Sequence, residues 1–189
     1  MPACVEPLNP DDLDSIISSV EARIAVEKAR EAATDKWQGD IGEHVSAQLA
    51  ELLGFNPVEF EPKDKGFDRV HQDSEGRLVV VEAKMVQNTN DDPTGRRQGP
   101  ELLSNTRKDG EQLSPSWIAA KAERMQDPSS ALYSPSNAKI GYEISRDPDN
   151  VRAVLVSIDM EGIATAYERQ SDGSWDQLGI WDSREKGEL

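Results

Sequence analysis

Two short segments with the composition of β-strands, residues 66–70 and 78–84, constrain the fold of this chain most strongly. The turn-forming sequence Asp-Ser-Glu-Gly lies between them, so we expect the two strands to form an antiparallel hairpin. Side chains alternate along a strand, so Glu82 and Lys84 point to the same face. A turn centred in that sequence places Asp68 opposite Glu82, give or take one residue of register. Two carboxylates and one ammonium then meet at the end of an apolar strand.

This charged cluster has two interpretations. Glu82 and Lys84 can form a cross-strand ion pair on a solvated face of the sheet. However, a continuous apolar run, residues 78–81, precedes Glu82, and such a run indicates a strand covered on both faces. Charged side chains at the edge of a hydrophobic core are costly unless they pair or bind a metal. The apolar run therefore favours a functional site at the mouth of the core.

The arrangement resembles the PD-(D/E)xK nuclease superfamily, whose members share the restriction-endonuclease-like fold. The matching residues are Asp68 and the triplet Glu82, Ala83 and Lys84 at the end of the Val-rich strand. Phe67 stands where the family name has proline. The resemblance implies an α/β fold, with a restriction-endonuclease-like mixed central sheet flanked by helices.

Two further segments match in the expected order along the chain. A Gly-Glu pair that ends at Glu43 lies on a predicted upstream helix, where many members of the superfamily supply one more acid. Gln112 begins a Gln-x-Ser-x-x-Trp segment like that of one branch of these nucleases. The resemblance spans roughly residues 37–125. Glu43 lies away from the apolar stripe of its helix, so it either points toward the site or faces solvent.

The resemblance implies a Mg²⁺-dependent (or Mn²⁺-dependent) endonuclease that hydrolyses phosphodiester bonds by a metal-activated water. DNA is favoured over RNA as the substrate, and the sequence leaves the choice between them open. Asp68 and Glu82 would be metal ligands together with the carbonyl of Ala83, because Mg²⁺ prefers hard oxygen ligands. Lys84 would orient the water or stabilise the charge of the transition state. Gln112 would be an accessory that bonds the water or a phosphate oxygen, and its alternative is a polar loop residue.

The net charge of the chain is −15, with 36 acidic residues against 21 Lys plus Arg, whereas most nucleic-acid-binding proteins are basic. One explanation is halophilic adaptation, in which an acidic proteome works at molar salt and screening lengths fall to about 3 Å. The other is that the protein does not bind nucleic acid, or mimics it. Four cations between the strand and Gln112 favour the first explanation, because a basic loop suits phosphate contact. They are Arg96, Arg97, Arg107 and Lys108. The same loop can also be merely a solvated excursion.

The sequence predicts an N-terminal helical extension at 1–36, one α/β domain at 37–182 and a polar tail at 183–189. Helices are expected at about 9–33, at 39–53 and from an N-cap at Ser114, and a loop at 87–110. Strands are expected at 58–60, 67–72, 78–84, 139–144, 151–158 and 163–169, with an edge strand at 175–181.

The single Cys4, the absence of a signal-peptide pattern at the start and the lack of a long apolar run favour a cytoplasmic location without membrane contact. Many enzymes of the superfamily are dimers, so a homodimer is a further expectation. Two rival functions stay open. The first is a catalytically silent binding or immunity-type module with the same fold, and the second is a structural protein in which the charged triplet is an accidental ion pair.

Overall fold

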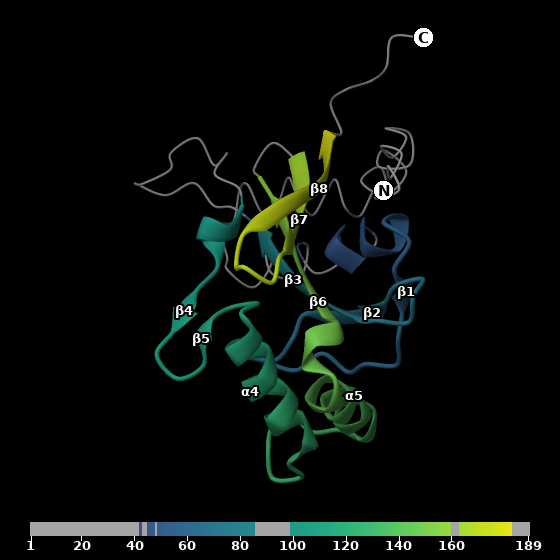
Figure 1. Cartoon of the computed structure of the whole chain (residues 1–189), viewed down its shortest axis with the longest axis vertical. Helices are drawn as coiled ribbons and strands as arrows, with labels where there is room; N and C mark the ends of the chain where they lie inside the picture. The colour runs from purple at the N-terminus through teal and green to yellow at the C-terminus, as the bar shows by residue number, and fades with distance from the viewer. Residues whose placement is uncertain (1–41, 43–44, 48, 86–98, 160–162, 183–189) are drawn as a thin grey trace, which may run out of the picture.

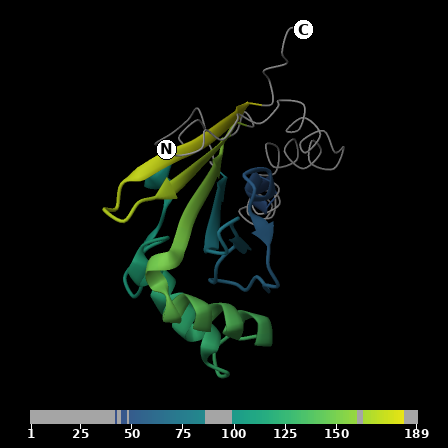
Figure 2. The ribbon, with the colours of Figure 1, turned by 45° about the vertical axis from the view of Figure 1, so that its right-hand side comes forward.

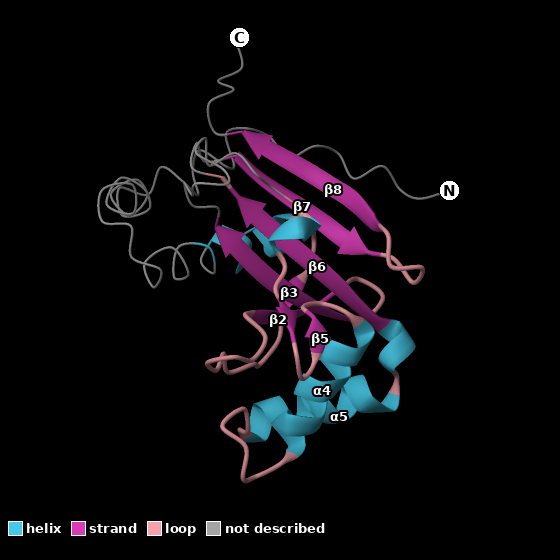
Figure 3. Ribbon diagram, turned by 90° about the vertical axis from the view of Figure 1, so that its left-hand side faces the viewer, coloured by secondary structure: helices cyan, strands magenta, loops and turns pink. Residues whose placement is uncertain are grey.

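The computed structural model describes residues 42, 45–47, 49–85, 99–159 and 163–182 (Figure 1). Their centre is a mixed six-stranded sheet with the order β1-β2-β3-β6-β7-β8 (Figure 3). Strands β3 and β6 are parallel, and the other neighbouring pairs are antiparallel. The strands are β1 (Asn56–Pro57), β2 (Arg69–Gln72), β3 (Leu78–Met85), β6 (Val151–Ile158), β7 (Ile163–Arg169) and β8 (Trp175–Asp182).

The β2–β3 hairpin forms as the sequence predicts. Its turn is fixed by Asp73, whose carboxylate accepts hydrogen bonds from the backbone N–H groups of residues 75 and 77. The ladder pairs Arg69 with Val81. The preceding residue, Asp68, therefore lies opposite Glu82, within the predicted register.

Strand β3 is buried on both faces, which explains its unbroken run of apolar residues. Val79 and Val81 face a helix that comprises the described helical residues between 42 and 52, here called the upstream helix. Its buried side chains Val45 and Leu49 cover that face (Figure 2). Val80 points to the opposite face, toward the two helices that follow β3 in the chain.

The connection from β3 to the parallel strand β6 contains a small hairpin and these two helices. The hairpin is formed by β4 (Asn105–Thr106) and β5 (Gly110–Glu111), and it follows a short 3-10 turn at Pro100–Leu102. The helices are α4 (Pro115–Gln126) and α5 (Pro135–Arg146), and a 3-10 turn at Pro148–Asn150 leads into β6. Each helix begins at a serine N-cap that is followed by proline, Ser114 and Ser134.

Several predicted elements are confirmed: the strands at 78–84, 151–158, 163–169 and 175–181, and the helix that begins after Ser114. The upstream helix ends near Gly54, as expected, with Gly54 at φ 83° and a Phe55 N–H bond to the Ala50 carbonyl. The core is therefore a mixed α/β structure with helices on both faces of the sheet.

Other predicted elements are wrong. Residues 139–144 belong to α5 and not to a strand, because Ile140 and Ile144 bury one helical face. Residues 58–60 lie after the short strand β1 and form no strand themselves, and β2 begins at Arg69 and not at 67. The part of the predicted loop that the structure describes contains the β4–β5 hairpin.

Several predictions fall outside the described residues: the extension at 1–36 with its helix, the tail at 183–189 and the acid Glu43. Within the described part of the chain, no helix is both long enough and apolar enough to cross a membrane.

Candidate active site

Glu82 is the most deeply buried acid of the predicted cluster, with 3% of its surface exposed. Its Oε1 atom accepts hydrogen bonds from Lys84 Nζ at 2.9 Å and from Gln112 Nε2 at 2.5 Å. Its other oxygen, Oε2, is buried and has no hydrogen-bond partner in the described part of the chain. A buried carboxylate oxygen without a hydrogen-bond partner is costly, so this atom requires an explanation.

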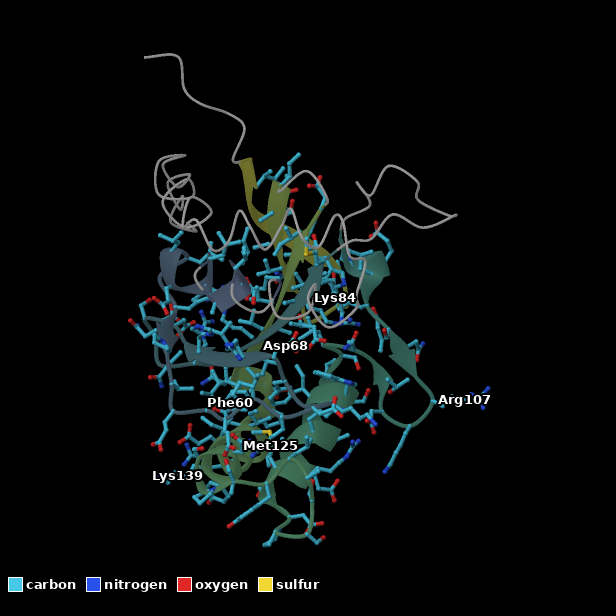
Figure 4. All side chains as sticks on the ribbon, turned by 180° about the vertical axis from the view of Figure 1, so that it is seen from behind. Phe60, Asp68, Lys84, Arg107, Met125 and Lys139 are labelled. Carbon is cyan, nitrogen blue, oxygen red and sulfur yellow. The ribbon has the colours of Figure 1, made fainter. Side chains whose placement is uncertain are left out.

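Asp68 is fixed beside Glu82 by the backbone of β3. Its Oδ2 atom accepts a hydrogen bond of 2.7 Å from the Ala83 N–H. Figure 4 shows Asp68 on the β2 segment and Lys84 on the neighbouring β3, in the middle of the molecule. The structure thus brings together the two acids, the backbone of Ala83 and the Lys84 ammonium, as the sequence predicts.

Both carboxyl groups have a raised pKa. Burial, and then the charge of Asp68, raise the pKa of Glu82 to about 7, although the Lys84 ammonium acts in the opposite direction. Burial also raises the pKa of Asp68, against the opposing effects of the Ala83 N–H and Lys84. Both carboxyl groups are therefore harder to ionise than ordinary acids, because the ionised form loses solvation when it is buried.

Gln112 contacts the acidic cluster directly. Its side-chain amide donates to Glu82, and its Oε1 accepts the Ser104 N–H at 2.9 Å. The backbone N–H of Gln112 also donates to the Ser104 carbonyl. The next residue, Leu113, is fully buried at φ 61°, a left-handed conformation that is rare for a branched side chain. The contacts of Gln112 with Ser104 therefore position its side chain to donate to Glu82.

The two predicted basic residues that the structure describes, Arg107 and Lys108, do not lie at the carboxylates. Arg107 and Lys108 are exposed in the loop between β4 and β5, and Figure 4 shows Arg107 at the outer tip, away from Asp68. Arg96 and Arg97 lie outside the described residues. The described cations of this segment therefore lie on a hairpin that projects from the molecule, and not in an irregular loop.

Glu43 lies outside the described residues, but its neighbour Gly42 shows where the upstream helix meets the sheet. A Cβ atom on Gly42 would lie 3.7 Å from the Ala83 Cβ. Ala83 points to the face opposite to Glu82, so the upstream helix approaches the end of β3 from the other side. Within the described residues, no group of three or more His, Cys, Asp or Glu side chains could hold a metal ion. Asp68 and Glu82 are the two carboxylates of the predicted cluster that the structure describes.

Sequence reasoning assigned no role to a buried ion-pair cluster beside the site. Lys121 on α4 is 5% exposed, and its Nζ lies 3.6 Å from Asp109 Oδ2 in the β4–β5 hairpin. Arg124 pairs with the same carboxylate. One feature of the sequence points to this cluster: Lys121 lies four residues after Trp117, on the apolar face of the predicted helix. A lysine on such a face needs a partner, because a buried ammonium is rarely unpaired.

Comparison with known proteins found no matching family model, no matching curated protein and no matching solved structure.

Proposed function

We propose that this protein is a metal-dependent nuclease that hydrolyses phosphodiester bonds, in DNA rather than RNA, on a restriction-endonuclease-like core. The observation that carries the proposal is the buried, unpartnered Oε2 of Glu82 next to the carboxylate of Asp68. A structural ion pair between Glu82 and Lys84 would give no reason to bury a second acid beside them. A divalent cation would supply the missing partner of Glu82 Oε2 and would balance the charge of both acids.

The donor atoms fit Mg²⁺ or Mn²⁺. Asp68 and Glu82 would hold the ion with the carbonyl of Ala83, a set of hard oxygen ligands that leaves positions for water. When bound, such an ion lowers the pKa of a coordinated water and neutralises charge on a phosphate.

The other side chains support this chemistry. Lys84 is 25% exposed at its side chain, so its ammonium keeps contact with Glu82 while it remains accessible to a phosphate oxygen. Gln112 holds Oε1 of Glu82, which leaves Oε2 free for the ion. Both residues therefore orient one carboxylate from the same side.

The order of elements supports the finer fold assignment. Asp68 immediately precedes β2, the Glu-Ala-Lys triplet lies on the central strand β3, and Gln112 comes just before α4. The exposed pair Arg107 and Lys108 would contact the backbone of the nucleic acid at a distance from the reacting phosphate. The net charge of −15 then requires that binding take place at high ionic strength, where this charge is screened.

The test is cleavage of supercoiled plasmid at molar KCl with Mg²⁺ or Mn²⁺, with single-stranded DNA and RNA as parallel substrates. We expect the plasmid to be nicked or linearised, and we expect this cleavage to stop in EDTA. Glu82→Gln and Lys84→Met should each reduce the cleavage rate at least about a hundredfold. Lys139→Ala, at an exposed position on α5, is the matched control and should cleave normally.

If no substrate is cleaved although the wild-type protein binds metal and nucleic acid, the proposed activity is wrong and the protein is a binding module. Cleavage that survives Glu82→Gln would place the reaction elsewhere in the protein.

A further inference from the structure

Lys121 is a buried cation with three partners from three parts of the chain. Its Nζ donates a hydrogen bond of 2.6 Å to the Lys65 carbonyl and lies 3.6 Å from Asp109 Oδ2. It also lies 5.2 Å from the centroid of the Trp117 ring, in cation–π contact. Burying an ammonium group is costly without such partners. The segments that Lys121 joins therefore matter for its role.

The first connection leads to Asp68. Lys65 lies three residues before Asp68 and adopts φ 63°, the left-handed region that non-glycine residues rarely occupy. Lys121 holds the carbonyl of this residue, and Phe67 packs on Trp117 with ring centroids 5.5 Å apart. Helix α4 therefore fixes the segment that delivers Asp68 to the site.

The second connection leads to Glu82. Asp109 belongs to the β4–β5 hairpin, which lies beside α4 in Figure 1, and its carboxylate pairs with both Lys121 and Arg124. Three residues later, Gln112 donates to Glu82 Oε1. The hairpin that positions Glu82 is thus tied to the same lysine as the segment that positions Asp68.

We propose that Lys121 is a positioning residue of the candidate site, which sets the spacing of the Asp68 and Glu82 carboxylates by joining the segments that carry their supports. Lys121 touches no substrate. Both segments offer acceptors, a carbonyl and a carboxylate, so an apolar side chain cannot replace the ammonium. The relevance of this spacing to catalysis rests on the proposed function, but the positioning itself does not.

The first experiment measures amide hydrogen exchange in wild type, Lys121→Met and Arg124→Met, without metal. The Ala83 N–H donates to Asp68, so its exchange rate reports the position of that carboxylate. We expect Lys121→Met to speed exchange at Ala83 by about tenfold relative to the neighbouring β6 amides. Arg124→Met is the matched control, because it removes a cation from Asp109 without touching Lys65, and it should leave Ala83 unchanged.

The second readout is the Mg²⁺ concentration that gives the half-maximal cleavage rate. Residues that orient metal ligands typically change metal affinity by about 10–100-fold, so Lys121→Met should raise this concentration about tenfold. The rate at saturating Mg²⁺ should fall much less. If the wild-type protein neither binds metal nor cleaves, the proposed function fails, whereas exchange at Ala83 still decides the role of Lys121.

Equal acceleration at Ala83 and in β6, or no change at Ala83, would overturn the proposal and leave Lys121 a general stabilising residue. If Lys121→Met does not fold, Asp109→Asn replaces it, since this change keeps the Lys65 contact and weakens the link of Lys121 to the hairpin; Arg124→Met controls for the Arg124 pair, which Asp109→Asn also weakens. The side-chain amide resonances of Gln112 should then shift in Asp109→Asn and stay in place in Arg124→Met. Unshifted resonances in Asp109→Asn would also overturn the proposal.

Discussion

Glu82 holds a negative charge where the surrounding protein disfavours it. The side chain lies at the end of a buried strand, beside a second acid, and one of its oxygens has no hydrogen-bond partner in the described residues. Neither packing nor solubility accounts for such an arrangement. Residues that break a local rule of stability in this way are most common at functional sites.

Replacing Glu82 by glutamine should stabilise the metal-free protein at alkaline pH. The pKa of Glu82 is about 7 in the folded protein against an ordinary value of 4.5, so folding favours the protonated carboxyl. The stability that the protonated Glu82 carboxyl contributes is fully present below about pH 4.5, and it is lost as the pH rises through 7. Glu82→Gln resembles the protonated form, so its advantage over wild type should grow between pH 5 and 8, to at most about 3 kcal/mol. Urea unfolding in EDTA measures this difference.

Lys84→Met serves as the opposite control for that measurement. The ammonium lowers the pKa of Glu82, so its removal should make the total stability loss with rising pH larger and extend it to higher pH than in wild type. If the difference in the free energy of unfolding between Glu82→Gln and wild type does not change with pH, the pKa of Glu82 is not raised in the folded protein.

Individual site residues differ in how far the sequence predicts them. Asp68 and Glu82 could be placed opposite each other because strand alternation and a recognisable turn fix the register of a short hairpin. Lys121 could not be given a role, because its partners lie 56 residues away at Lys65 and in a hairpin. Such contacts depend on how the elements pack, which no local pattern shows.

Helix α5 has a helix N-cap signal in its sequence, but few apolar residues to mark its helical face. Its N-terminus has the same Ser-Pro cap that predicts α4, yet residues 139–144 read as a strand. Gly141 weakens the helical pattern of this segment, since glycine is a poor helix former. The structure gives the reason for the glycine: a Cβ at this position would lie 2.5 Å from the Ala122 carbonyl of α4.

Gly141→Ala should therefore destabilise the protein, although the same change in an open helix stabilises it by about 1 kcal/mol. The added methyl group would meet a backbone oxygen that cannot move without shifting α4. We expect a loss of about 1–3 kcal/mol in the free energy of unfolding. Glu143→Ala, at an exposed position of the same helix, should stay within about 0.5 kcal/mol of wild type. A Gly141→Ala protein as stable as wild type would show that the two helices pack less closely.

The β4–β5 hairpin could not be predicted because its strands have two residues each, too few for a periodic pattern. Its order comes from tertiary contacts, above all from Asp109, whose side chain is only 7% exposed between Lys121 and Arg124. From the sequence alone, Asp109 in its Lys-Asp-Gly turn is expected to face solvent. The structure shows that it anchors the hairpin to α4.

In the whole molecule, the two layers of helices explain both the core and the site. The upstream helix covers one face of β3, and α4 and α5 cover the other, so the last residues of β3 lie at the border of two apolar clusters. The apolar run of β3 predicts this burial. The acidic composition is compatible with this core, because many of the described acids lie on the surface or in ion pairs such as Arg152 with Glu168.

The melting temperature of the protein with and without Mn²⁺, at pH 8, tests most directly whether Asp68 and Glu82 form one metal site. A ligand at about 100 times its dissociation constant stabilises the folded state by about 2.7 kcal/mol. For a chain of 189 residues this corresponds to a rise of roughly 5–10 °C. The rise should be present in wild type and absent in both Asp68→Asn and Glu82→Gln. An equal rise in all three proteins, or none in wild type, would contradict the metal site.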